Sequence, residues 1–279
     1  MRRLLITLST SLGLLASPVA AKPAGEAADA EVCEGCEALL DLALAHSRRK
    51  EDRVRDSFRH PAETLSFFKV TPGMTVVDFM PSSGWYTRVL VPYLGTDGRY
   101  IGLNPGATGN ARFDGYVGGL REKFPAKAAE WNLDGASLQA FNSDELTEEM
   151  NGTVDRVLIF REMHNLHRYG LIHNELNRLH DVLKAGGMLG IVQHRAKDDA
   201  PADYVMGDKG YMREQDVIGL VEAHGFELVA KSEINANPKD TADHEAGVWE
   251  LPPAMRTARE ELRSLGESDR MTLLFRKRM

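Results

Sequence analysis

The stretch MTVVDFMPSSGWY, residues 74–86, decides the fold of this chain. In the first seven residues of this stretch, 74–80, five apolar residues surround Asp78. This pattern is typical of a strand buried on both faces of a parallel sheet. The turn formers from Pro81 to Gly84 end that strand, and residues 86–94 show helical spacing. Strand, turn and helix in this order predict the first unit of an α/β domain.

Six more predicted strands follow along the chain: 99–103, 138–141, 154–160, 188–192, 226–234 and 271–276. Predicted helices at 171–183, stopped by Gly186-Gly187, and at 214–224 separate some of them. This alternation predicts a doubly wound, seven-stranded, mostly parallel sheet with helices on both faces. The polar, proline-containing insertion at 235–269, with a short helical piece near 254–265, lets the last strand return antiparallel as a terminal hairpin.

The chain ahead of the sheet is predicted to be helical over residues 27–68, in segments 31–45 and 48–58 and in a short helix that starts at Pro61. We therefore divide the chain into a signal peptide (1–21), a helical N-terminal extension (22–70) and an α/β domain (71–279) with the insertion 235–269. Cys33 and Cys36 are the only cysteines, and their spacing fits a redox dithiol, an oxidised staple or two unpaired thiols.

The first 21 residues have the composition of a secretory signal peptide. Arg2 and Arg3 precede an apolar stretch from Leu4 to Ala16, and small residues end at Ala21. A stretch of 13 residues is too short to cross a bilayer core of about 30 Å as a helix. We therefore expect a periplasmic protein, cleaved near Ala21, without a membrane span. The formal charge of −7 and the absence of long basic runs argue against nucleic acid as a partner.

Polar segments follow the predicted strands and, in an open parallel sheet, would gather in one crevice at the carboxyl ends of the strands. Among them are residues 81–86, 104–106, 142–145, 161–165, 193–195 and 235–240.

Two segments resemble motifs of class I S-adenosylmethionine-dependent methyltransferases. Val76 to Tyr86 resembles their first motif. Lys184 to Ile191 resembles the segment that follows their fourth strand. The longer strings at 60–65, 232–240 and 266–273 resemble a little-characterised bacterial family of exported predicted methyltransferases, over about residues 35–276. The resemblance implies the class I, Rossmann-like fold and S-adenosylmethionine as cofactor.

The resemblance also implies a cofactor site after the first three strands. Asp78 and Gly84 would bound the cofactor, Asn104 would lie on its ribose side and Asp144 on its adenine side, and the remaining contacts come from Pro81 and Ser82. Met80 and Ser82 stand where the first motif usually has glycines, which allow close approach of the backbone.

Histidines supply the candidate catalytic groups. His164 follows the strong strand 154–160 and is the first candidate for a general base with a pKa near 6.5; His194 is the second. His164, His167 and His194 with Glu162 could instead bind a metal, but an extended segment would point Glu162 and His164 to opposite sides. We predict no metal site. Trp85 is expected to pack in the core, and the insertion 235–269 is expected to cover or select the substrate.

The function predicted from the sequence is methyl transfer from S-adenosylmethionine to an unidentified small-molecule or protein acceptor. The alternative is a non-catalytic periplasmic binding or assembly protein that uses the same crevice for another ligand.

Overall fold

Seven strands form one sheet in residues 35–278, the part of the chain that the structure, a computed structural model, describes. The strands are β1 (Thr75–Phe79), β2 (Arg99–Asn104), β3 (Ser137–Asn142), β4 (Val154–Phe160), β5 (Leu183–His194), β6 (Phe226–Ser232) and β7 (Arg270–Lys277). Their order is β3-β2-β1-β4-β5-β7-β6. The first five strands pair in parallel, whereas β7 runs antiparallel to both β5 and β6. The predicted doubly wound sheet with a terminal hairpin is confirmed.

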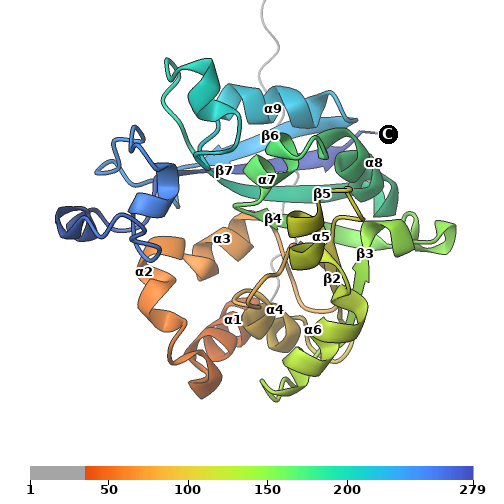
Figure 1. Cartoon of the computed structure of the whole chain (residues 1–279). Coiled ribbons are helices and arrows are strands. Elements are labelled where there is room, and N and C mark those ends of the chain that lie inside the picture. Colours follow the sequence, from red (N-terminus) through yellow and green to blue (C-terminus); the bar gives the residue numbers. More distant parts are fainter. Residues whose placement is uncertain (1–34, 279) are drawn as a thin grey trace, which may run out of the picture. The chain divides into compact units, whose positions relative to one another are not determined.

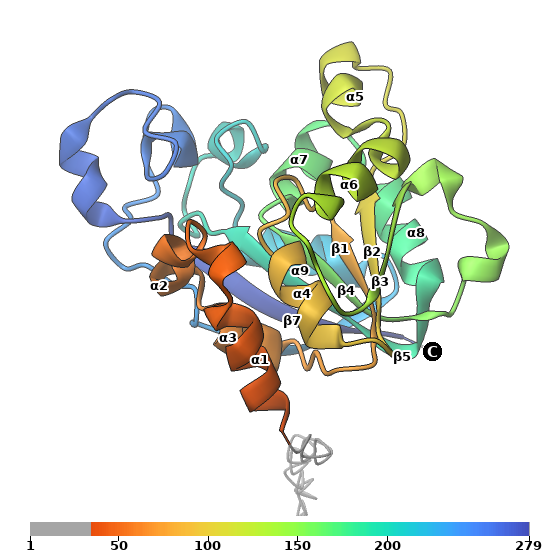
Figure 2. The ribbon, with the colours of Figure 1, turned by 90° about the horizontal axis from the view of Figure 1, so that it is seen from below.

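Helices cover both faces of this sheet (Figure 1). One face carries α5 (Ala111–Val117), α7 (Met163–Arg168), α8 (Ile172–Val182) and α9 (Glu214–Glu222). The other face carries α1 (Cys36–Ala45), α3 (Pro61–Phe67), α4 (Thr87–Leu94) and α6 (Leu120–Ala129), with α2 (Asp56–Arg59) beside α3 (Figure 2). This sandwich explains why every residue of β1 is buried: a central strand here has no face that meets water.

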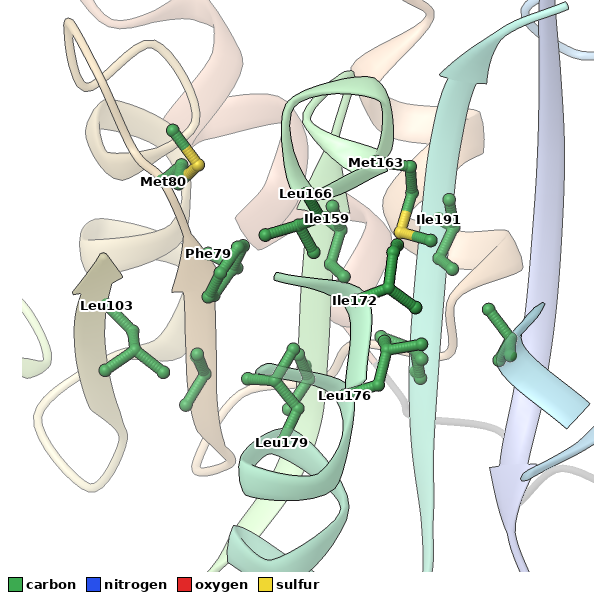
Figure 3. Packing of buried hydrophobic residues seen from close by; sticks show 14 of the residues in the cluster. Phe79, Met80, Leu103, Ile159, Met163, Leu166, Ile172, Leu176, Leu179 and Ile191 are labelled. Carbon is green, nitrogen blue, oxygen red and sulfur yellow. The ribbon is translucent and has the colours of Figure 1, made fainter. Parts of the chain in front are cut away.

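Apolar packing against the sheet holds α7, the helix that follows β4, in place. Met163 and Leu166 of α7 and Ile172 of α8 are buried against the sheet residues Phe79 and Ile159 (Figure 3). These apolar contacts hold the remaining side chains of α7 toward the carboxyl end of the sheet.

A glycine in β5 allows the N-terminal helices to reach the sheet. A Cβ at Gly190 would lie 2.6 Å from the ring of Phe68, the residue that ends α3. Only the missing side chain lets this ring pack directly on the strand.

The N-terminal extension differs in detail from the prediction. The α3 helix starts at Pro61 as expected, because proline presets the backbone angle of the first helical turn. The segment predicted as one helix over 48–58 is instead two 3-10 turns, Ser47–Arg49 and Arg53–Arg55, followed by α2. Cys36 is disulfide-bonded, which rules out the unpaired state for it; Cys33 and the predicted signal peptide lie outside the described residues.

Several other elements were missed or misplaced. The long connection before β3 holds two helices that were not predicted, α5 and α6; α6 contains Pro125 and only a few buried residues. Gly186 and Gly187 do not end a helix but lie inside β5, which starts at Leu183. The helical piece of the insertion is two 3-10 turns, Gly247–Glu250 and Glu260–Leu265. The remaining 3-10 turns are Ser143–Glu145, Glu148–Met150 and Ala202–Val205.

The helices in the described range 35–278 are all too short or too polar to cross a membrane.

Candidate functional site

A cavity of about 880 Å³ opens at the carboxyl ends of β4 and β5. Its walls come from α5, from residues 161–169 around α7, from the end of β5, and from the loops at 208–209 and 246–256. The volume falls within the range of about 300–1,000 Å³ that is common for small-molecule sites. The cavity lies beside the β1–β4 boundary, where the strand order reverses and open α/β sheets bind their ligands.

The two predicted catalytic histidines meet in this cavity. His164 lies on α7 and is 6% exposed, and His194 is the last residue of β5. Their ring centroids are 5.8 Å apart, and Nδ1 of His194 lies 2.6 Å from Oγ of Ser268. The structure thus brings together two side chains that are 30 positions apart in the sequence.

Both imidazoles are far weaker bases than a free histidine. Burial, with the nearby Arg168 cation, lowers the pKa of His164 to about 3. Burial also lowers the pKa of His194 well below its usual value, and His164 and Arg270 contribute in the same direction. The expected titration of His164 near pH 6.5 is therefore wrong in this environment, and both rings are neutral at neutral pH.

The expected orientation of Glu162 and His164 is also wrong. The segment is not extended: Glu162 is the N-cap of α7, and both side chains line the cavity. A metal site does not follow, since the described residues contain no cluster of three histidine, cysteine, aspartate or glutamate side chains suited to a metal ion.

Three residues around α7 line this cavity and also carry buried polar atoms without hydrogen-bond partners. Nδ1 of His164, Oδ1 of Asn165 and Nε of Arg168 are buried and have no hydrogen-bond partner within residues 35–278. Each of these residues lines the cavity. Buried polar atoms are almost always hydrogen-bonded in folded proteins, so three unpaired atoms next to one wall mark a region whose polar groups the protein alone does not satisfy.

Arg161 and Glu162 form the wall where β4 ends. Arg161 has φ +64°, a left-handed conformation that is strained for a residue with a Cβ. Glu162 accepts a hydrogen bond from Nδ2 of Asn165 at 2.5 Å, and burial raises its pKa to about 7. A carboxyl with this pKa can take up or release a proton near neutral pH.

The insertion forms the opposite wall. Trp249 packs edge-on against His164, with ring centroids 5.9 Å apart, and Arg256 lies 4.8 Å above the Trp249 ring. Ala246, Trp249 and Arg256 all line the cavity, so the insertion reaches the place where it was expected to act.

A buried carboxylate holds the insertion in place. Asp240 accepts hydrogen bonds from Oη of Tyr211 at 2.8 Å and from the backbone N–H of Asp269 at 2.7 Å. Its other oxygen lies 2.9 Å from Nε2 of His244. One side chain thereby ties both ends of the insertion to the loop after β5.

The first-motif residues do not face the same cavity. Asp78 is 2% exposed, accepts a hydrogen bond from Oη of Tyr100 at 2.9 Å, and has its pKa raised to about 7 by burial. Gly84 has φ +75°, and a Cβ there would lie 2.1 Å from the ring of Trp131. The glycine is thus required by its conformation and by a packed tryptophan, and the space over it is filled by protein.

The other predicted cofactor residues are also separated. Nδ2 of Asn104 donates to the carbonyl oxygen of Val117 at 2.8 Å. Pro81 is buried, and Asp144 lines two smaller cavities of about 530 and 430 Å³ instead. None of the six lines the large cavity, but Ser82 lies next to it, since Oη of the lining residue Tyr116 donates to Oγ of Ser82 at 3.3 Å. The six residues stay predictions as cofactor ligands.

The basic side chains of the cavity were not predicted from the sequence. Arg112, Arg168, Lys209 and Arg256 come from four separate segments, and no local spacing links them. The polar run that starts at Arg161 was noted, but nothing in it distinguishes Arg161 from any surface arginine. Trp85, in contrast, is packed as expected, 6% exposed beneath the guanidinium groups of Arg49 and Arg59.

Comparison with known proteins supports the fold and no more. No protein-family model matches the sequence, and neither does any curated relative. Among solved structures, the chain is similar to a SAM-dependent methyltransferase from Aquifex aeolicus, with 15% identity and a TM-score of 0.51 over 83% of this chain and 99% of that one. It is similar also to the [4+2]-cyclase SpnF, with 13% identity and a TM-score of 0.51 over 79% and 80%.

With its strand order and terminal hairpin, the protein has the class I methyltransferase fold. One of the two similar structures is named a methyltransferase and the other a cyclase. A shared fold hosts different reactions, so the reaction has to be argued from the cavity.

Proposed function

We propose that the protein is an S-adenosylmethionine-dependent methyltransferase whose acceptor is a small molecule bound in the large cavity. The observation that supports this most is the position of that cavity, at the carboxyl ends of β4 and β5 in a class I methyltransferase fold, with buried unpartnered polar atoms on its wall. When bound, S-adenosylmethionine supplies a methyl group on a sulfonium.

The lining residues fit such a cofactor on the side of α5. Tyr116 is 60% exposed, so its ring offers a free face on which adenine can stack. The hydroxyls of Tyr116 and Ser82 lie together at the rim and can hydrogen-bond a ribose diol. The acceptor then lies on the opposite side, between α7 and Trp249.

The different pKa values of His164 and Glu162 suit these two residues to different catalytic roles. The neutral ring of His164 orients the acceptor by accepting a hydrogen bond from its O–H or N–H. Glu162, with a pKa near 7, is better matched than His164 to receive the proton at neutral pH. With any acceptor found, the rate rises as the pH passes through about 7, and Glu162→Gln removes this rise while His164→Asn keeps it at lower turnover. A rise that survives Glu162→Gln contradicts the assignment.

Calorimetry with S-adenosylmethionine and S-adenosylhomocysteine tests the proposal directly. We expect micromolar binding to the purified protein, and at least about fivefold weaker binding in Tyr116→Ala, because stacking of a base on an aromatic ring contributes about 1–3 kcal/mol. Phe58→Ala is the matched control, since Phe58 is an exposed aromatic that does not line this cavity. Absence of binding by either compound at millimolar concentration would overturn the proposal.

One observation favours the alternative, a binding or assembly protein without catalysis. The place where the first motif should meet a cofactor is filled, with Trp131 over Gly84 and Asp78 hydrogen-bonded to Tyr100. Failure of both cofactor forms to bind, together with binding of another small molecule in the cavity, would establish this alternative.

We propose further that the protein is exported after cleavage near Ala21, in line with the arginines and apolar stretch at its start. Mass spectrometry of the N-terminus of protein recovered from the periplasmic fraction tests this. An uncleaved chain in the cytoplasm would contradict it.

A further inference from the structure

The large cavity is basic although the chain as a whole is acidic. Its lining holds five cationic side chains, Arg112, Arg161, Arg168, Lys209 and Arg256, against the two carboxyl groups of Glu162 and Asp208. The whole chain has a formal charge of −7. Such a local reversal of charge concentrates anions.

Behind one wall of the cavity, three arginines share a single carboxylate. Glu267 contacts Arg55 at 2.5 Å, Arg270 at 2.5 Å and Arg59 at 3.5 Å. Arg59, Arg270 and Glu267 are each at most 5% exposed. Burial alone would raise the pKa of Glu267, but Arg270 and the other two guanidinium groups hold it at about 2. One charged carboxylate therefore leaves this buried cluster with a surplus of positive charge.

Arg161 connects that cluster to the cavity. Its guanidinium forms no hydrogen bond or ion pair with any of residues 35–278, and it lines the cavity. It lies within electrostatic range of Arg59, Arg270 and Glu267. Glu267 is the carboxylate with the largest electrostatic effect on Arg161, but Arg55, Arg59 and Arg270 already share it. Burial raises the pKa of Glu162 and of Asp78 to about 7, so these two carboxyls do not neutralise Arg161 fully at neutral pH.

We propose that Arg161 binds the oxyanion of the cavity's ligand, a carboxylate or phosphate on a small molecule, while His164 and Trp249 contact the rest of that molecule. Arg161 is half-buried, and a cation that is partly removed from water and lacks a partner is costly. A bidentate oxyanion is the group that best matches a guanidinium. The strained backbone at Arg161 fits this role, since strain is retained where it places a functional side chain.

The anion site itself does not depend on the proposed function. Only the role of the bound anion does: in a methyltransferase it is the methyl acceptor. Carboxylate and phosphate share the geometry that Arg161 recognises. The aromatic ring of Trp249 in the opposite wall favours an acceptor with a flat apolar part next to the anion.

Calorimetry at constant ionic strength with inorganic phosphate, acetate, benzoate and the neutral benzyl alcohol tests the anion site. Benzoate or phosphate should bind, and benzyl alcohol should bind at least about tenfold more weakly than benzoate, because a hydrogen bond to a charged group is about twice as strong as a neutral one. Phosphate binding better than benzoate assigns a phosphorylated acceptor, and the reverse order assigns an aromatic acid. Equal binding of benzoate and benzyl alcohol would overturn the proposal.

Arg161→Gln should weaken binding of the anion at least about tenfold. The matched control is Arg276→Gln, which removes an arginine whose ion pair with Glu227 is half exposed and does not line the cavity. Unchanged anion affinity in Arg161→Gln would overturn the proposal.

A melting experiment separates binding from a structural role. Without ligand, Arg161→Gln should melt at the same temperature as the wild type or higher, because it removes an unpaired cation beside Arg59 and Arg270. A lower melting temperature in the variant would mean that Arg161 supports the fold, and would overturn its assignment to a ligand.

S-adenosylhomocysteine in the same calorimetry series separates the two proposals. If the anion binds at Arg161 and S-adenosylhomocysteine does not bind, the anion site stands and the methyltransferase proposal falls. If S-adenosylhomocysteine binds and no anion does, the anion site falls and the methyltransferase proposal stands.

Discussion

Polar side chains at the two halves of the sheet's carboxyl edge differ in whether they find hydrogen-bond partners within the protein. At the ends of β1, β2 and β3, Asp78 bonds to Tyr100 and Asn104 to Val117, so the groups are satisfied within the protein. At the ends of β4 and β5, His164 and Arg161 keep polar atoms without partners and line a cavity. The half that carries the first motif, which we call the closed half, has only the two smaller cavities beside Asp144. The half with the large cavity, which we call the open half, contributes its lining from outside the first motif.

The largest expected change in stability comes from a substitution in the buried arginine cluster behind the large cavity. Glu267→Gln leaves Arg55, Arg59 and Arg270 without their shared counter-ion, and the free energy of unfolding at pH 7 should fall by about 3–5 kcal/mol. Urea denaturation measures this, with the exposed ion-pair member Glu260 changed to Gln as a control that should show no measurable loss.

The pH dependence of this effect has a definite sign. Because the folded pKa of Glu267 is about 2, below its ordinary 4.5, its stabilisation is present above pH 4.5 and is lost as the pH falls through about 2. Wild type and variant should therefore converge in acid. A constant difference down to pH 2 would show that the carboxylate is not the counter-ion.

In the closed half, Gly84→Val should reduce the free energy of unfolding by about 2–4 kcal/mol, because valine is strained at φ +75° and its side chain collides with Trp131. Denaturation of Gly84→Val alone and combined with Trp131→Ala measures the collision, which the second substitution should partly relieve. Ligand affinity in the protein that stays folded should be unchanged. Lost binding with full stability would show instead that this half is the ligand site.

A smaller effect is expected from Asp78→Asn. Asp78 keeps its proton up to about pH 7 in the folded state, against an ordinary pKa of 3.8. Its contribution to stability is therefore complete below pH 3.8 and is lost as the pH rises through about 7. Between these pH values, unfolding releases the proton of Asp78, so the free energy of unfolding falls with pH by up to about 1.4 kcal/mol per pH unit. The substitution should remove this part of the slope.

Denaturation curves of wild type and Asp78→Asn between pH 5 and 8 measure this slope, and the exposed Asp97→Asn is the control. An unaltered slope in Asp78→Asn would mean that Asp78 is already ionised when folded, as an exposed cofactor ligand would be.

The smallest effect is expected from Asn104→Ala, about 1 kcal/mol of stability, which is typical of one lost hydrogen bond. The carbonyl of Val117 keeps a second donor, Nδ2 of Asn142 at 3.1 Å, so no acceptor is left unpaired. Thermal melting measures the loss. A large fall in affinity for S-adenosylhomocysteine without loss of stability would restore Asn104 to the ribose site.

The strands could be predicted from the sequence because strands buried on both faces of a sheet appear as short apolar runs, and β1, β4 and β7 are such runs. Helices α5 and α6 could not, since Gly115, Gly118, Gly119 and Pro125 argue against helix there. Packing of Phe113 and Phe124 against the sheet overrides those local preferences.

The candidate site was predictable only in part. Strand ends meet at one edge of a parallel sheet, and this placed His164 and His194 correctly in one crevice. Burial is a property of the assembled fold, so neither the low pKa of His164 nor the raised pKa of Glu162 could be inferred from neighbours in sequence. The arginine cluster combines residues 55–59 with 267–270, a separation that no local pattern reveals.

The position of β7 has a consequence for biosynthesis. It is the last strand to be made, yet it lies inside the sheet between β5 and β6. Until residues 270–277 emerge, β5 and β6 each keep an unpaired edge, and Arg270 is missing from the wall behind the cavity. Exposed strand edges invite pairing with other chains. A nascent chain therefore cannot complete the wall behind the cavity before this strand is made, and its strand edges stay open to aggregation until then.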